Sequence, residues 1–386
     1  MKASVAVLSL AAMLVACRGG GSANTIFTVS YNGNGNTGGS VPVDPTYYLQ
    51  GQTVTVFGNT GNLVNTGYSF EGWNRQNNGA GINYTQAQTF TMGPANVTLY
   101  ANWIAGYAYV ANYNVNNVSQ YRIGVNGVLT ALSPATVTAG THPTSVTVDP
   151  SGMYAYVANS GDNTVSQYTI GANGVLTPMT IATVATGTDP SSVTVDPTGM
   201  YAYVANSGDN TVSQYTIGSD GSLSPMATAA VAAGTLPISV AVDPSAKYAY
   251  VANLLDSTVS EYLIGTDGSL ASMATATVAS GTYPTSVAVH PSGKYAYVAN
   301  YGDTVSQYTI GADGTLSPMA TPLVSASLGP YSVTVEPSGR FAYVANAVSN
   351  NVSGYTIGTS GELTYIDPPV VASGTGPFSI TTVAVH

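Results

Sequence analysis

Charged side chains are scarce in this sequence. Only 6% of its 386 residues are charged, the basic residues number seven, and the formal net charge is −10. The exposed faces of a helical bundle need Lys, Glu and Arg, so this composition excludes such a bundle. It also excludes a disordered chain, because 44% of the residues are apolar. No basic stripe is present, and nucleic acids and anionic membrane surfaces are therefore poor electrostatic partners.

Cysteine is almost absent. Cys17 is the only one, so no intrachain disulfide can form. It follows Lys2 and the apolar run Ala3–Ala16, which is too short to span a bilayer and is typical of a signal segment. The letters LVAC that end at Cys17 resemble the lipobox of bacterial lipoproteins. The resemblance implies cleavage before Cys17, its lipidation, and a membrane partner for the chain. Arg18 at the next position resembles outer-membrane sorting. The alternative is an ordinary signal peptide followed by an unrelated cysteine.

Tyrosine and glycine are abundant instead, with 28 Tyr and 43 Gly. Together with Val and Thr they indicate many short strands joined by tight turns. We expect a signal peptide over 1–16, lipidated Cys17 and a flexible tether over 17–24, a small β-rich module over 25–104, and a repeat domain over 105–386. In the module, GYSFEGW at 67–73 and VTLYANW at 97–103 resemble the internalin-type B repeat. Both tryptophans lie there and are expected in its core.

One motif fills the rest of the chain. YAYVAN begins at Tyr107 and returns at steps of 47, 47, 47 and 47 residues, and FAYVAN follows after 46. Period-two alternation and turn signals divide each repeat into four antiparallel strands, which predicts one propeller blade per repeat. Near-identical copies are expected where each blade packs between two others. We expect an all-β fold, a six-bladed β-propeller whose first blade is closed by a C-terminal strand at Phe378–Val385.

The repeat, with VAN and DPSG-type turns, resembles the YVTN-type repeat and the lactonase-like superfamily, which includes 6-phosphogluconolactonase-like proteins. The resemblance implies a propeller and allows lactone hydrolysis, although such families are mostly seven-bladed. Enzymes of that superfamily carry charged residues around the channel mouth. In this chain most acidic residues recur at turn positions in every blade and are expected to form turns. No metal cluster, cofactor motif or nucleotide loop is present.

The repeats differ from one another at the loops that border one face. These positions are candidates for ligand binding, although loops also vary without function. The candidates are Tyr113, His142, Asp189, Leu236, Ile238, Leu254, Tyr283, Tyr301, Tyr331 and Phe378. His142 and Asp189 are the candidate pair for proton transfer, although a surface histidine is often inert.

These patterns favour a monomeric, lipid-anchored protein of the bacterial cell envelope that binds a glycan, peptide or protein at the propeller mouth. A lactone hydrolase that uses His142 and Asp189 is the enzymatic alternative. A structural envelope protein without a specific ligand is the third. Whether the chain is an enzyme stays open at this stage.

Overall fold

The computed structural model describes residues 25–380 apart from 67, 80, 125–127 and 172. Their regular structure consists of strands β1 to β30 and one 3-10 turn, η1 (Tyr113–Val115), so the protein is all-β. No helix in these ranges is long and apolar enough to cross a membrane. Two compact units form. One runs to Asn65 and includes Phe70–Asn102, and the other comprises Thr66–Ser69 and the chain from Trp103 onward. The predicted signal segment and Cys17 lie outside the described residues.

The first unit consists of short strands around a buried indole. Trp73 is fully buried, and its Nε1 donates a hydrogen bond to the carbonyl of Phe57 at 2.9 Å. The Tyr31 ring meets the indole edge-on, with centroids 4.6 Å apart. β1 pairs with β3 and β4 with β7 in antiparallel register, and β2 pairs with β8 in parallel. The strands are β1 (Ile26–Phe27), β2 (Val29–Asn32), β3 (Tyr48–Leu49), β4 (Thr53–Thr55), β5 (Ser69–Asn74), β6 (Asn83–Tyr84), β7 (Thr89–Thr91) and β8 (Val97–Asn112).

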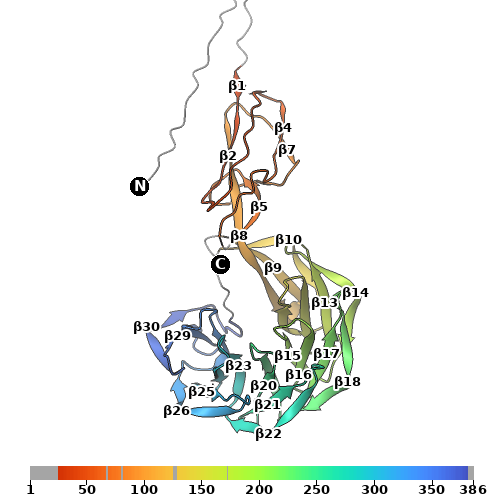
Figure 1. The fold of residues 1–386 in the computed structure, drawn as a ribbon, viewed down its shortest axis with the longest axis vertical. Helices are drawn as coiled ribbons and strands as arrows, with labels where there is room; N and C mark the ends of the chain where they lie inside the picture. The colour runs from red at the N-terminus through yellow and green to blue at the C-terminus, as the bar shows by residue number, and fades with distance from the viewer. Residues whose placement is uncertain (1–24, 67, 80, 125–127, 172, 381–386) are drawn as a thin grey trace, which may run out of the picture. The chain divides into compact units, whose positions relative to one another are not determined.

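β8 is longer than the sequence indicated, because it joins the end of the module to the first repeat. The predicted boundary at residue 104 lies inside this strand. Its last residues pair with β9 (Asn117–Gly124), which pairs with β10 (Leu129–Thr138). A register shift between Ile104 and Gly106 is the irregularity in the β8–β9 pairing. β8, β9 and β10 therefore form a first blade of three strands (Figure 1).

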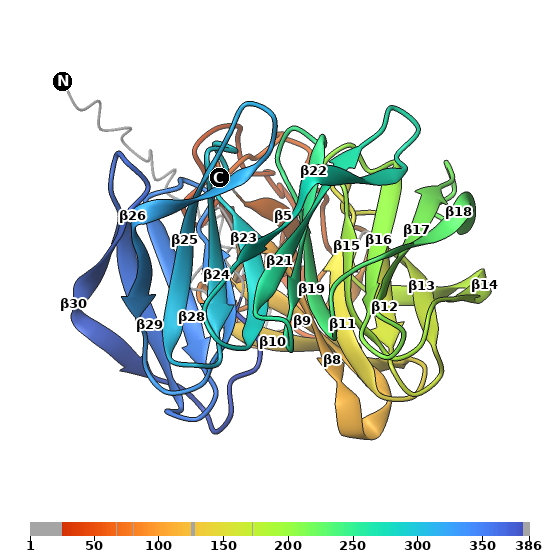
Figure 2. The same cartoon turned by 90° about the horizontal axis from the view of Figure 1, so that it is seen from below.

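Five four-stranded sheets follow, each with its strands in chain order from the innermost to the outermost. The strands of the first three are β11 (Pro143–Val148), β12 (Tyr154–Asn159), β13 (Thr164–Ile170), β14 (Leu176–Ala185), β15 (Pro190–Val195), β16 (Tyr201–Asn206), β17 (Thr211–Ile217), β18 (Leu223–Ala232), β19 (Pro237–Val242), β20 (Tyr248–Asn253), β21 (Thr258–Ile264) and β22 (Leu270–Ala279). Those of the last two are β23 (Pro284–Val289), β24 (Tyr295–Asn300), β25 (Thr304–Ile310), β26 (Leu316–Ser325), β27 (Pro330–Val335), β28 (Phe341–Asn346), β29 (Asn351–Ile357) and β30 (Leu363–Ala372). Neighbouring sheets stand side by side as propeller blades, so the described chain has six blades (Figure 2).

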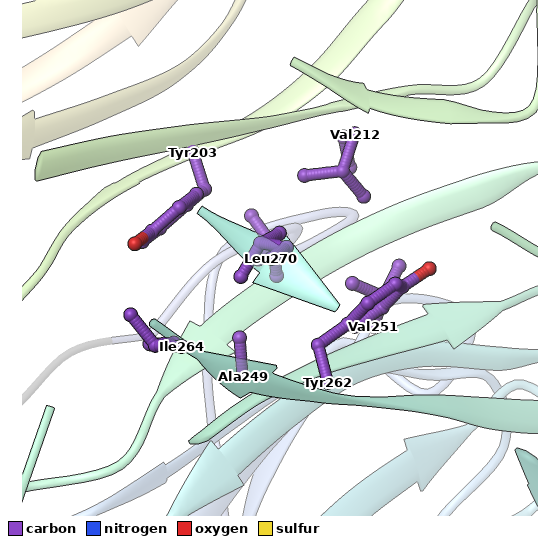
Figure 3. Close-up of a cluster of buried hydrophobic side chains, with 9 residues drawn as sticks. Tyr203, Val212, Ala249, Val251, Tyr262, Ile264 and Leu270 are labelled. Atoms are coloured by element: carbon purple, nitrogen blue, oxygen red, sulfur yellow. The ribbon is translucent and has the colours of Figure 1, made fainter. Parts of the chain in front are cut away.

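Each blade is apolar on both faces because a neighbour covers each face. Tyr203 and Val212 of the blade β15–β18 face Leu270 and Val251 of the blade β19–β22 (Figure 3). All four side chains are buried. Burying a Val or Leu side chain contributes about 1.5–3 kcal/mol, and the contact recurs from blade to blade. This explains why a chain with so few charges folds into a propeller.

The interfaces also share a set of hydrogen bonds, which accounts for the repeated Tyr and Gln. The Tyr203 hydroxyl donates to the carbonyl of Gly268 in the next blade at 2.7 Å. Gln214 Oε1 accepts the backbone N–H of Leu270 at 2.5 Å. Gly268 has a φ of +80°, and a Cβ there would lie 2.2 Å from the ring of Tyr201. Glycine is therefore required at this hairpin.

The C-terminal segment begins as the other innermost strands do. The N–H of Ile380 donates to Ser332 Oγ at 3.2 Å, as that of Val333 does to Ser286 Oγ. However, residues 377–380 form no strand, and residues 381–386 lie outside the described part of the chain. Closure of the first blade by Phe378–Val385 therefore stays a prediction.

Candidate functional site

We define the rim face as the end of the propeller at which the innermost strands begin and the second strands end. His142, which precedes Pro143, accepts the backbone N–H of Ser160 at 3.0 Å. Its own N–H donates to Asn116 Oδ1 of the preceding blade at 2.9 Å. The same two contacts recur in the four blades that follow. The variable rim residues are thus held on a constant backbone scaffold.

The residue before each of these prolines has a left-handed backbone. The φ values are 52° for His142, 54° for Asp189, 58° for Leu236, 56° for Tyr283, 67° for Gly329 and 61° for Gly376. This conformation costs a residue with a side chain roughly 1–2 kcal/mol, whereas glycine adopts it freely. Four blades therefore carry a residue with a side chain at a position where glycine would have less conformational strain. The sequence pattern did not reveal this, because only the glycines at 329 and 376 hint at the conformation.

The residues after the prolines divide into two groups. Thr144 Oγ1 lies 2.9 Å from the carbonyl of Pro190 in the next blade, and Ser191 and Thr285 make the equivalent contact. These hydroxyls tie successive blades together and belong to the scaffold. Ile238 and Tyr331 replace the hydroxyl and are half-buried at the rim. The two substitutions are therefore departures from the scaffold, as the sequence comparison of the repeats indicated.

His142 is exposed and stacks on the ring of Tyr113, with centroids 4.5 Å apart and the planes 8° from parallel. Its ring lies over the hairpin that carries Asp162, because a Cβ added at Gly161 would be 3.1 Å from His142 Nδ1. The N–H and hydroxyl of Thr141, and then the charge of His142, hold the pKa of Asp162 below its ordinary value. Asp189 instead accepts a hydrogen bond from Ser207 Oγ at 2.9 Å. Among the described residues, His142 and Asp189 form no hydrogen bond or ion pair with each other.

Asp162 was missed as a site residue because it recurs in the repeat. Asp209, Asp256 and Asp303 occupy the equivalent hairpins, and a residue present in several blades is expected to form turns. That role is real, because Asp162 Oδ2 accepts the N–H of Thr141 at 2.5 Å. Its second role beside His142 exists in one blade only, since the equivalents of His142 are Asp, Leu, Tyr and Gly. No sequence signal distinguishes that blade except His142 itself.

Four aromatic side chains lie on the rim face of the last two blades and the segment that follows them. We call Tyr283, Tyr301, Tyr331 and Phe378 the aromatic arc. Tyr283 is 47% exposed, Tyr301 43% and Phe378 64%. Tyr331 meets Phe378 edge-on at 4.8 Å. Burial, and then the charge interaction with Tyr301, raise the pKa of Tyr331. Leu236, Ile238 and Leu254 of the preceding blade are half-buried.

The two faces of the propeller differ in charge. Lys247, Lys294 and Arg340 directly precede β20, β24 and β28, at the end opposite the rim face, and Arg122 pairs with Tyr107 near that same end. Arg75 lies in the first unit, and Lys2 and Arg18 lie outside the described residues. The described rim face therefore holds no Lys or Arg. A pocket of about 430 Å³ lies on the opposite face, between Lys247 and Gly293, away from the candidate residues.

The acidic residues of the opposite face form turns, as predicted. Asp196 Oδ1 accepts the N–H groups of Met200 and Tyr201, both at 2.9 Å, and Asp149, Asp243 and Glu336 act in the same way. Within the described ranges, no group of three or more His, Cys, Asp or Glu side chains is placed to hold a metal ion. The side chains of the rim positions supply an imidazole, carboxylates, hydroxyls and aromatic rings.

Comparison with known families divides the chain in the same two parts. The family described as Lactonase, 7-bladed beta-propeller matches residues 65–378. The Listeria-Bacteroides repeat domain matches residues 27–102. These matches confirm both resemblances seen in the sequence. The described residues supply six blades, one fewer than the description of the first family states.

Solved structures share the fold at low sequence identity. A candidate 6-phosphogluconolactonase from Bacteroides fragilis is 20% identical, with a TM-score of 0.62 over 85% of this chain and 96% of its own. A periplasmic gluconolactonase from Pseudomonas aeruginosa is 19% identical, with a TM-score of 0.60 over 84% and 96%. A candidate membrane protein of Evansella cellulosilytica is 34% identical over 24% of this chain. This chain spans 10% of the length of that curated relative and 18% of a second one.

Proposed function

Because the chain belongs to the family described as Lactonase, 7-bladed beta-propeller, we propose that its rim face hydrolyses the ester of a sugar lactone. The observation that carries the proposal is the exposed His142, stacked on Tyr113 and lying over the hairpin that carries Asp162. His290, the other histidine among the described residues, lies on the opposite face. Both of its ring nitrogens are engaged there, with Ser292 and Gly339. His142 is therefore the imidazole available for proton transfer at the rim.

His142 acts as a general base in this proposal. A neutral imidazole nitrogen takes a proton from water, and the oxygen of that water attacks the lactone carbonyl carbon. The ring C–O bond then breaks, and the imidazolium returns the proton to the leaving alkoxide. The products balance as lactone plus water to hydroxy acid. Asp162 stabilises the transient imidazolium, and the Tyr113 hydroxyl is the donor available to the developing oxyanion.

The charge of the rim face selects among lactones. A phosphorylated substrate needs Lys, Arg or a metal ion as a partner for the phosphate. The described rim carries no Lys or Arg, and several carboxylates lie there instead. An uncharged sugar lactone is therefore the preferred substrate in this proposal, and 6-phosphogluconolactone is disfavoured at this face.

The test compares glucono-δ-lactone with 6-phosphoglucono-δ-lactone, using the full-length chain and subtracting spontaneous hydrolysis. We expect turnover of the uncharged lactone and a loss of about 100-fold or more in H142A, the usual worth of a general base. The matched control is H290D, which restores the aspartate found at that turn in three other blades and should keep full activity. Absence of turnover with both lactones, or equal rates for wild type and H142A, would contradict the proposal.

The comparisons support this hydrolase alternative better than the adhesion role that the sequence alone favoured. Lipid anchoring at Cys17 and a location in the cell envelope are separate proposals. Metabolic labelling with a fatty acid tests them, since C17S should abolish incorporation while leaving lactone turnover unchanged.

A further inference from the structure

The aromatic arc is an exposed surface of aromatic rings on the rim face. Tyr283 and Tyr301 come from one blade and are joined by a 2.8 Å backbone hydrogen bond from the Tyr301 N–H to the Tyr283 carbonyl. Tyr331 comes from the next blade, and Phe378 meets it edge-on. The rings are thus presented on a hydrogen-bonded scaffold. No catalytic role is assigned to any of them.

Tyr283 shows that this surface is maintained against a conformational cost. Its φ of 56° lies in the left-handed region, where a bulky aromatic residue is a rare outlier. Gly329 and Gly376 occupy the same position in neighbouring repeats and meet no such cost. Tyr283 is nearly half exposed, so burial does not repay the strain. His142, Asp189 and Leu236 share this conformation, but Tyr283 is the one of the four that adds an exposed ring to the aromatic arc, which makes the ring a candidate for recognition.

The charges on the rim face limit what the arc can recognise. Asp162, Asp189, Asp209, Asp256 and Asp303 lie on this face, and the described residues place no Lys or Arg there. Anionic ligands, such as acidic peptides, phosphosugars and anionic lipid surfaces, are repelled. Tyrosine rings offer an apolar face together with a hydroxyl, which suits the C–H faces and hydroxyl groups of an uncharged sugar. Polyols also accept hydrogen bonds from, and donate them to, the neighbouring polar groups.

We infer that the aromatic arc is a carbohydrate-binding surface for a neutral saccharide chain. This goes beyond the proposed hydrolysis, because it assigns binding to residues outside the His142 site and requires no lactone. Tyr283, Tyr301 and Phe378 provide the exposed rings, and Tyr331 supports Phe378. Binding weakens when an exposed ring is removed, even though the fold is retained.

The experiment is affinity electrophoresis of the full-length chain in a detergent without a sugar headgroup. Native gels contain hydroxyethylcellulose, galactomannan, arabinoxylan or xyloglucan, and a parallel gel contains anionic polygalacturonate. We expect retardation by at least one neutral polysaccharide and none by polygalacturonate. In Y283G the dissociation constant should rise about tenfold, the effect of losing one hot-spot residue. Its melting temperature should not fall, because glycine relieves the left-handed strain.

A246G is the matched control. Ala246 has a φ of 56° in a turn on the opposite face, where glycine stands in the other four-stranded blades, so this variant makes the same kind of backbone change away from the arc. It should bind as wild type does, and so should H142A, which separates this test from that of the hydrolase. The inference is overturned if none of the four neutral polysaccharides retards the protein, or if Y283G is retarded equally. The inference is also overturned if polylysine beads retain the protein while no neutral polysaccharide retards it. That result would favour a cationic peptide as the ligand.

Discussion

Glu261 is the one acidic residue in a row of glutamines that links successive blades. The other positions are Gln120, Gln167, Gln214 and Gln307, and each accepts a leucine N–H from the next blade through Oε1. Each also donates through Nε2 to the carbonyl fourteen residues further along its own blade. Glu261 Oε1 accepts the Leu316 N–H at 2.5 Å, but its buried Oε2 has no hydrogen-bond partner. The equivalent carbonyl in this blade is that of Thr275.

Replacing Glu261 by Gln should therefore stabilise the protein. The amide supplies the donor that a carboxylate lacks, and leaving a buried polar group unpaired costs about 1–3 kcal/mol. For a propeller of this size that corresponds to a rise of about 2–5 °C in melting temperature. Calorimetry at pH 8 measures the shift. Q214E, which introduces the acid one blade earlier, should lower stability by a similar amount.

The effect should depend on pH with a definite sign. Burial raises the pKa of the Glu261 carboxyl above its ordinary value of 4.5, so the folded state favours the protonated form, which can donate to the Thr275 carbonyl. A carboxyl whose pKa is raised in the folded state contributes to the free energy of unfolding. That contribution is complete below pH 4.5 and is lost as the pH rises through the folded-state pKa. The gain from E261Q should thus be small at pH 4 and full at pH 8. A gain independent of pH, or a loss of stability at pH 8, would refute this reasoning.

Three further predictions concern the blade interfaces. Tyr203→Phe should lower the free energy of unfolding, measured by urea denaturation, by about 1–3 kcal/mol, because the buried carbonyl of Gly268 loses its donor. An unchanged midpoint of the urea transition would argue against this hydrogen bond. Burial raises the pKa of Tyr109, Tyr215 and Tyr262 to about 12, so stability should fall from pH 10, where unfolded tyrosines ionise, up to pH 12; absorbance at 295 nm should show these hydroxyls ionising with unfolding rather than before it. Truncation after Gly376 should lower the melting temperature if the C-terminal segment closes the first blade, and no change would rule out closure.

Much of the fold could be predicted from the sequence, because the same residues recur where each blade has the same packing environment. Tyr, Ala and Val alternate in YAYVAN since both faces of β16 are covered, and the structure buries Ala202, Tyr203 and Val204 completely. The boundary between the two parts was less predictable. The module and the first repeat meet within β8, where alternation continues and no turn residue marks an end.

The candidate site was predicted in part. The rim positions could be found because they differ between repeats whose strands are nearly constant. In the structure they lie on one hydrogen-bonded scaffold. The role of Asp162 near His142 could not be found, because aspartate recurs in the same hairpin of four blades as a turn residue and acquires this second role only through the neighbouring loop. The left-handed backbone at Tyr283 was equally hidden, since φ is set by contacts with Ser257 of the preceding blade and Tyr301 of its own.

The sequence by itself therefore determined the all-β class, the blade as the repeating unit, and the positions at which blades differ. Local alternation and turn chemistry suffice for those, because they act over a few residues. Only the tertiary structure decided which side chains meet across blades. It placed the hairpin that carries Asp162 beside His142, left Glu261 Oε2 without a partner, and brought the rings of the aromatic arc to one face. Each of these depends on residues that packing brings together from separate loops.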